Sequence, residues 1–119
     1  EETNSSSIVL RVRYGETAFL LSGDLPLNEE NILAREFGDG LDANVLKLGH
    51  HGSRTSTSAY WLSAVSPDIA VISAGKDNRY GHPHKEVVEL LKEKNIPTLT
   101  TFEEGTITFS SDGETVSRN

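Results

Sequence analysis

Cysteine is absent from the 119 residues of this chain, which excludes disulfides and zinc sites built on cysteine. A metal ion would have to be held by His, Asp or Glu. No apolar run approaches the roughly 20 residues of a membrane-spanning helix, so we expect a soluble segment with no membrane contact of its own. Basic residues are also few, and 18 Asp and Glu against 11 Lys and Arg give a net charge of -7. This balance argues against a broad electrostatic grip on nucleic acid but leaves room for a local basic patch.

The chain has the length and hydrophobicity of one small domain. Its mass of 13.0 kDa and its 35% of hydrophobic residues are enough for a single layered core, and two independent domains would not fit. The hydrophobic and charged contents are ordinary for a folded protein, so disorder throughout is not expected. Residues 1–119 are therefore interpreted as a single domain.

Segments with strand character alternate with segments of helical character. Alternation of apolar and polar residues predicts a β-hairpin from residues 8–14 and 17–21. After it the sequence predicts helix, strand, helix, strand and helix, in that order, at residues 26–37, 44–48, 58–65, 68–73 and 83–94. Two final strands, at residues 97–101 and 106–110, are expected to be joined by Glu103-Glu104-Gly105. This order predicts an α/β fold that has a mixed sheet with helices between the strands.

The loops that follow the strands contain most of the reactive side chains. In α/β folds, ligands gather at these strand ends. Three such loops begin at Asp24, at His50 and at about Lys76, and all four histidines of the chain lie in the second and third loops. This clustering is the main functional signal of the sequence.

Asp24 and the His50-His51 pair each admit two interpretations. Asp24 ends an apolar strand, where its carboxylate can bind a cation or cap the following helix. The histidine pair lies between Gly49 and Gly52, which allow a sharp turn close to a ligand. One imidazole can then bind a metal ion while the other contacts a substrate anion or orients a ligand, although the pair can also be a solvated turn.

Two polar segments could bind phosphate. Residues 53–58 offer hydroxyl groups that can cap the next helix or, with Arg54, hold a phosphate; Ser53 lacks the strained turn expected of a serine nucleophile. Residues 76–85 gather cationic and aromatic groups in an otherwise acidic chain, as a phosphodiester-binding rim requires, although they also fit a solvated loop. The spacing of His82 and His84 does not start a His-x-His-x-Asp-His metal motif, because Glu86 and Val87 follow in place of Asp and His.

Three motifs in this order resemble the metallo-β-lactamase-fold domain of ComEC-type competence proteins. They are Leu20-Leu-Ser-Gly-Asp24, Leu46-Lys-Leu-Gly-His-His-Gly-Ser53 and Arg79-Tyr-Gly-His-Pro-His84, and Asn4-Ser5 and residues 69–75 also resemble that family. The resemblance covers nearly the whole chain. It implies the C-terminal half of an αββα sandwich. The N-terminal half, with the His-x-His-x-Asp-His segment that supplies most metal ligands, is absent, and the start at Glu1-Glu2 fits an excised piece.

The resemblance also implies roles for individual residues. Asp24 matches a carboxylate that bridges two divalent metal ions, zinc or manganese, and His50 is favoured over His51 as a further ligand. His51 and His82 are then expected to be catalytic, as groups near the scissile phosphate. Substrate binding is assigned to the remaining polar groups of the loops: Ser53, Lys76, Arg79 and His84.

The implied activity is metal-dependent cleavage of phosphodiesters, by attack of a metal-activated hydroxide. In the parent protein, expected in a bacterial inner membrane, the substrate would be one DNA strand degraded or processed during uptake. A small phosphodiester is an alternative substrate, and a non-catalytic module that binds DNA or a partner is an alternative function. With too few ligands, this chain alone is expected to bind metal weakly or not at all and to show little or no hydrolysis. Loss of the facing half predicts self-association.

Overall fold

The computed structural model describes residues 7–119, so Asn4 and Ser5 lie outside the described residues. Its first elements are β1 (Leu10–Tyr14) and β2 (Thr17–Leu21), which pair antiparallel with Tyr14 opposite Thr17. Gly15 takes a positive φ of 59° in the turn between them, a conformation that favours glycine. The predicted hairpin is therefore confirmed.

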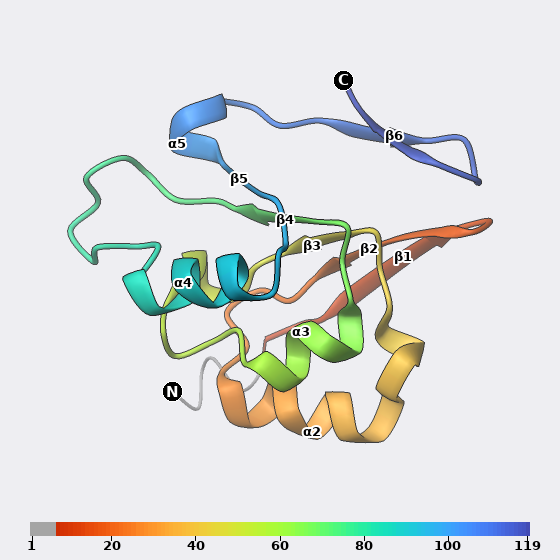
Figure 1. Cartoon of the computed structure of the whole chain (residues 1–119), viewed down its shortest axis with the longest axis horizontal. Helices are drawn as coiled ribbons and strands as arrows, with labels where there is room; N and C mark the ends of the chain where they lie inside the picture. The colour runs from red at the N-terminus through yellow and green to blue at the C-terminus, as the bar shows by residue number, and fades with distance from the viewer. Residues whose placement is uncertain (1–6) are drawn as a thin grey trace.

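Helices and parallel strands alternate after the hairpin (Figure 1). In chain order they are α2 (Leu27–Phe37), η1 (Gly38–Leu41), β3 (Val45–Lys47), η2 (Gly49–Gly52), α3 (Ala59–Val65), β4 (Ile69–Ile72), α4 (Lys85–Glu93) and β5 (Thr98–Thr100). The sheet has the order β1-β2-β3-β4-β5, with every pair after the first parallel. The α/β fold with a mixed sheet and helices between strands is confirmed. The α-helices and strands named here begin and end within two residues of their predicted bounds, whereas the short helices η1 and η2 were not predicted.

The core lies between the sheet and the helices α2, α3 and α4, which cover one of its faces (Figure 1). Alternate strand residues point toward these helices, among them Leu20, Leu46 and Ile72, and all three are almost fully buried. Trp61 of α3, the single tryptophan, is 0% exposed in this core. Burial of such large side chains supplies most of the stabilisation of the fold.

The end of the chain differs from its prediction. Residues 101–104 form a short helix, α5 (Thr101–Glu104), in place of a connection between paired strands. Thr100 is the capping residue of this helix and has the Thr-x-x-Glu spacing typical of helix starts; its hydroxyl donates to Glu103 over 3.0 Å, although no side chain bonds to the backbone at this cap. The last strands, β6 (Phe109–Ser111) and β7 (Val116–Arg118), form a separate hairpin, so the expected strand at 106–110 is shifted and β7 was not predicted.

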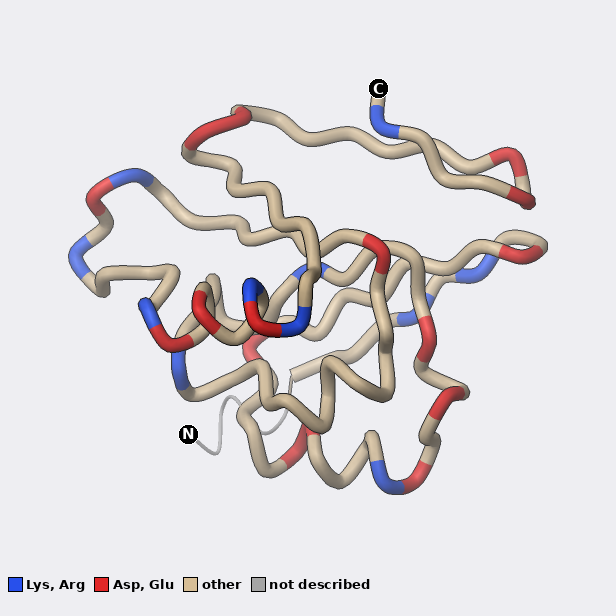
Figure 2. Tube along the Cα trace, viewed as in Figure 1, with Lys and Arg blue, Asp and Glu red and all other residues tan. Residues whose placement is uncertain are grey.

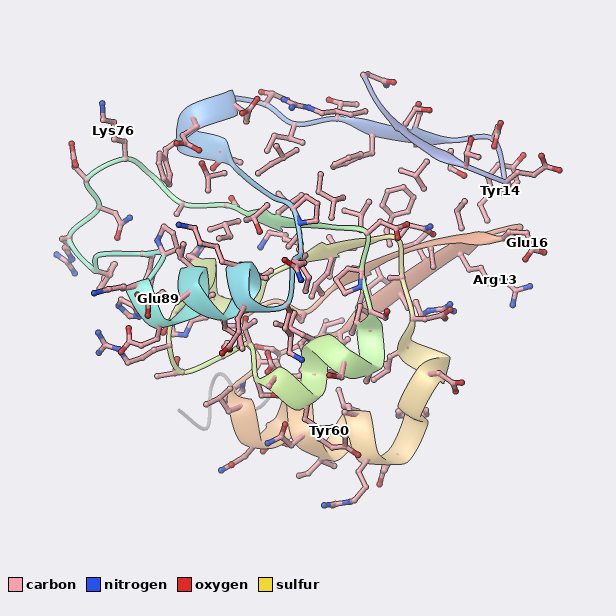
Figure 3. The ribbon with its side chains drawn as sticks, in the orientation of Figure 1. Arg13, Tyr14, Glu16, Tyr60, Lys76 and Glu89 are labelled. Atoms are coloured by element: carbon pink, nitrogen blue, oxygen red, sulfur yellow. The ribbon has the colours of Figure 1, made fainter. Side chains whose placement is uncertain are left out.

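The β6–β7 hairpin lies over the face of the sheet opposite the helices (Figure 1). A 2.6 Å hydrogen bond joins the hydroxyls of Thr17 and Ser111. At the edge of this face, the apolar side chains of β1 stay exposed: Leu10 by 53%, Val12 by 46% and Tyr14 by 60%. We call these three residues the β1 patch; Figure 3 shows Tyr14 beside the hairpin tip. In residues 7–119, no helix combines the length and apolar character needed to cross a membrane.

Candidate functional site

The three loops singled out by the sequence meet at one edge of the sheet. They follow β2, β3 and β4, whose carboxyl ends point the same way because these strands are parallel. The backbone N–H of His50 donates to the carbonyl of Gly23 over 2.8 Å, and the N–H of His84 donates to the carbonyl of Gly52 over 2.9 Å. The loops are thus joined to one another through their main chains, with Asp24 next to the first contact.

The loop between β3 and α3, residues 49–58, has an unusual backbone, and we call it the histidine loop. His50 and His51 have φ values of 51° and 56°, in the left-handed region, which costs about 1–2 kcal/mol for a residue with a side chain. Gly52 follows with a φ of 82°, and a Cβ on it would lie 2.7 Å from a side-chain atom of Pro83. Only glycine fits this close approach of two loops. Strain of this kind accumulates at functional sites, so the observation favours a role in binding or chemistry.

The imidazole rings of all four histidines come together in this region. The centre of the His82 ring lies 5.5 Å from that of His50, 6.1 Å from that of His51 and 4.7 Å from that of His84. The His50 and His51 ring centres are 6.4 Å apart. The sequence placed these histidines in two loops, and the fold brings them into one cluster, which we call the histidine cluster.

Hydrogen bonding fixes the ring of His51 more firmly than that of His50. Nδ1 of His51 lies 2.7 Å from the carbonyl oxygen of Ser73. A carbonyl only accepts, so Nδ1 carries the hydrogen and Nε2 keeps a free lone pair. This is how metal-binding imidazoles are commonly oriented. Nδ1 of His50 has a longer contact, 3.3 Å, to the hydroxyl of Thr55. The sequence favoured His50 as the metal ligand, whereas the geometry makes His51 at least as suitable.

His84 has both ring nitrogens engaged by the main chain. The backbone N–H of Arg54 donates to Nδ1 over 2.8 Å, so the hydrogen of the neutral ring is on Nε2, which donates to the carbonyl of Tyr80 over 3.1 Å. The side chain of Arg54 pairs with Glu86 at 3.1 Å. A substrate contact of His84, which stays a prediction, would require one of these hydrogen bonds to break.

His82 is the central ring of the cluster, and its surroundings disfavour the charged form of the ring. Its partial burial lowers the pKa of His82, and the nearby His84, His50, His51 and Arg54 lower it further. Within residues 7–119 we find no hydrogen bond to its ring. A neutral, unengaged imidazole can accept a proton or bind a metal ion, both of which suit a site for hydrolysis.

Asp24 is half-buried beside the histidine loop and does not cap α2. The capping position of α2 is Pro26, and no side chain bonds there. The capping interpretation is therefore wrong, and cation binding by Asp24 stays a prediction.

The side chains of the site supply only part of a metal centre. His and Asp are donors that suit zinc or manganese. In the part of the chain that the structure describes, however, no three His, Cys, Asp or Glu side chains converge closely enough to hold a metal ion. The residues fit such a centre by donor type but not by number, so further ligands would have to come from outside residues 7–119.

Residues 76–85, which we call the basic loop, include His82 and His84 of the histidine cluster, and the Lys and Arg positions of this loop are blue in Figure 2. The guanidinium of Arg79 lies 5.0 Å from the ring centre of Tyr80 and donates to its hydroxyl. The Tyr80 ring in turn stacks on His82 with 5.7 Å between the ring centres. Lys76 extends from the outer part of the loop into solvent (Figure 3). The Tyr80 ring thus lies between Arg79 and the histidine cluster, whereas Lys76 lies further out on the loop.

Ser53 is buried, and its hydroxyl is used within the histidine loop. Its oxygen lies 2.8 Å from the hydroxyl of Thr55 and accepts the Thr55 backbone N–H over 3.2 Å. This arrangement shapes the loop. A direct role of Ser53 in substrate binding stays a prediction.

The sequence interpretation missed two residues that shape these loops. Asn78 accepts the backbone N–H groups of Tyr80 and His82 and donates to the carbonyls of Gly75 and His82, with all four distances between 2.7 and 3.1 Å. Asparagine in a glycine-containing loop is a recognisable signal for such a turn. The second residue, Glu30, is a fully buried carboxylate of α2. Its acidic character at a helix start gave no signal beyond a favourable helix dipole.

Comparison with known proteins identifies relatives that are much longer than this chain. No protein-family model matches the chain. ComE operon protein 3 of Bacillus subtilis is 42% identical over 106 residues, which are 89% of this chain and 14% of that protein. Competence protein ComA of Neisseria gonorrhoeae is 43% identical over 108 residues, 91% of this chain and 16% of that protein. Recombination protein 2 of Haemophilus influenzae is 48% identical over 88 residues, 74% of this chain and 11% of that protein.

These relatives confirm the predicted relation to competence proteins. The matched regions of the first two relatives take up 89% and 91% of this chain. The chain spans between 11% and 16% of the length of these relatives, so it corresponds to a small part of each. The chain is therefore homologous to a segment of bacterial proteins named for competence and recombination.

Proposed function

We propose that this chain is part of a metal-dependent hydrolase that cleaves phosphodiesters, and that its substrate is one strand of DNA during competence DNA uptake. The observation that carries the proposal is the histidine cluster, which lies beside Asp24 at the carboxyl end of a parallel sheet. The names of the relatives, which refer to competence and recombination, support DNA as the substrate. The parent protein of this segment would lie in a bacterial inner membrane.

Each residue of the site has a role in this proposal. Asp24 and one of His50 and His51 would bind two zinc or manganese ions together with ligands from a preceding half of a metallo-β-lactamase-fold domain. Such ions supply an activated hydroxide and neutralise charge on the phosphate. His82, whose pKa is lowered by partial burial and by the neighbouring histidines, would contact the scissile phosphate and accept or return a proton.

The basic loop would bind the rest of the substrate. Arg79 projects from the edge of the histidine cluster, where a bidentate contact to a phosphate oxygen pair is within its chemistry. Lys76, further out, would attract the strand before it reaches the site. The overall charge of -7 requires that this attraction be local.

A cleavage assay on the larger domain of the parent protein tests the proposal. The domain is incubated with zinc or manganese and end-labelled single-stranded DNA, and in parallel with a small chromogenic phosphodiester. Cleavage of DNA that is lost in Asp24→Asn and kept in Asp39→Asn would support it. Asp39 is a matched control, because it is an exposed acid of η1 outside the three loops.

The alternatives give different outcomes of the same assay. Cleavage of the small phosphodiester alone would favour a hydrolase of small substrates. DNA binding without any cleavage would favour a non-catalytic module. Either result contradicts the proposal as stated, and the second would also remove the chemical role given to His82.

A further inference from the structure

Glu30 of α2 is a carboxylate buried away from solvent. Its side chain is 0% exposed, and no cation lies against it among the ion pairs of residues 7–119. Its two oxygens accept the backbone N–H groups of Thr57 and Ser58, over 2.8 and 2.9 Å. Burying a carboxylate is unfavourable because it loses its water, and the two hydrogen bonds offset only part of this cost. Both bonds go to the segment that ends the histidine loop.

The same segment makes three further hydrogen bonds, two to α2 and one to the residue pair before it. The Leu27 backbone N–H donates to the carbonyl of Thr55 over 2.9 Å. The hydroxyl of Ser58 donates to Asn31 over 2.7 Å, and that of Ser56 donates to the carbonyl of Leu25, just before α2. Residues 55–58 are thus joined by four bonds to α2 and by one to Leu25, and Glu30 accepts two of them.

The conformation of this segment needs external support. Thr57 has a φ of 66°, in the left-handed region that disfavours a β-branched side chain, and its buried hydroxyl oxygen has no hydrogen-bond partner within residues 7–119. The carboxylate of Glu30 accepts the N–H of this same residue. Without that bond the strained conformation would lose its main local stabilisation.

The segment also contacts the ring of His50. Thr55 lies between them: its hydroxyl is 3.3 Å from Nδ1 of His50, and its carbonyl is bonded to α2. On the other side of the loop, the N–H of His50 is fixed to Gly23 beside Asp24. Glu30 is therefore connected to the His50 ring through three residues of main chain and one hydroxyl group.

We propose that Glu30 is a positioning residue, which holds residues 55–58 so that Thr55 sets the orientation of the His50 ring relative to Asp24. Its importance for catalysis rests on the proposed function. The positioning itself does not, because it concerns only contacts within this chain.

The test is nuclear magnetic resonance of the metal-free chain, with no DNA present. In Glu30→Gln, one acceptor is replaced by an amide NH₂ that faces a backbone N–H. We expect hydrogen exchange of the Thr57 and Ser58 amides to become about tenfold faster, and the ring nitrogen signals of His50 to shift. The His51 ring, which is held by Ser73 on another element, should shift much less.

Glu29→Gln is the matched control. It removes the same charge from the neighbouring position of α2, and its side chain makes none of the bonds to residues 55–58. It should leave the His50 signals unchanged. If Glu30→Gln lowers the melting temperature but leaves the His50 signals of the folded protein in place, Glu30 is only structural and the proposal is overturned.

A second variant covers the case in which Glu30→Gln does not fold. Glu30→Asp keeps the charge but is one methylene shorter, so it reaches one of the two amides at most. It should shift the His50 signals in the same way, and unshifted signals would contradict the positioning role. The outcome is independent of the cleavage assay on the larger domain: His50 can be positioned by Glu30 in a protein without hydrolase activity, and the reverse also holds.

Discussion

Replacing Glu30 by Gln is expected to change how the free energy of unfolding depends on pH. Glutamine has nearly the same shape but does not titrate, so the difference between the two proteins isolates the ionisation of Glu30. Burial raises the pKa of Glu30 from 4.5 to about 7, although hydrogen bonds from Thr57 and Ser58 act in the opposite direction. The folded protein therefore keeps a proton on Glu30 over a pH range in which the unfolded chain has lost it.

The sign and size of the effect follow from the linkage between proton binding and folding. Between pH 4.5 and about 7 the folded state binds more protons than the unfolded chain, so the wild type loses stability relative to Glu30→Gln as the pH rises. The free energy of unfolding of the wild type, relative to that of the variant, is therefore highest below this pH window and lowest above it. A tenfold change in an ionisation constant is worth about 1.4 kcal/mol, so the relative loss is about 3 kcal/mol across the window.

Urea unfolding at a series of pH values from about 4 to about 8 measures this difference. The fluorescence of Trp61 reports unfolding, because it is the single tryptophan and is fully buried. Glu29→Gln should follow the wild type at every pH. Curves for the wild type and Glu30→Gln that run parallel over the whole range would refute the reasoning, because they would mean that Glu30 ionises in the folded protein as it does in water.

Three further predictions concern metal binding, loop structure and association. Calorimetric titration of this chain with zinc and manganese should show weak binding or none, because too few ligands converge, and stoichiometric sub-micromolar binding of two ions would contradict this. Asn78→Ala should leave the melting temperature nearly unchanged but speed hydrogen exchange of the His82 amide by about tenfold, because the four side-chain hydrogen bonds of Asn78 are lost; an unchanged exchange rate would show that the loop does not depend on Asn78. Sedimentation should detect dimers or larger species that Val12→Lys dissociates, because the β1 patch is exposed; a strictly monomeric wild type at high concentration would argue against self-association.

Much of the fold could be predicted because local patterns and packing agree. Apolar alternation marked β1 and β2, and the helices α2, α3 and α4 carry apolar faces that the sheet buries. The end of the chain could not be predicted in the same way. There the Thr100-x-x-Glu103 spacing outweighs the strand pattern, and the final hairpin is held by distant contacts such as that of Thr17 with Ser111. Contacts between residues far apart in sequence leave no periodic signal.

For the site, the sequence identified residue types but not their hydrogen-bonding states. It placed His50, His51, His82 and His84 near one another, and the fold brings their rings into one cluster. It could not distinguish their roles, because those depend on partners such as the carbonyl of Ser73 and the N–H of Arg54. Backbone groups are present at every position, so which of them faces an imidazole is settled only by the three-dimensional structure.

Three of the six non-glycine residues with positive φ in residues 7–119 lie in the histidine loop. His50, His51 and Thr57 are left-handed, each at a cost of about 1–2 kcal/mol, and the buried carboxylate of Glu30 adds a further unfavourable contribution above about pH 7. The core between the sheet and its helices contains no comparable strain among its main residues, such as Leu46. A loop without function could relax into lower-energy conformations, since its surroundings are partly solvent. That residues 55–58 are instead held by four hydrogen bonds to α2 and one to Leu25 indicates that the geometry of this loop is imposed by the fold, as a preorganised site requires.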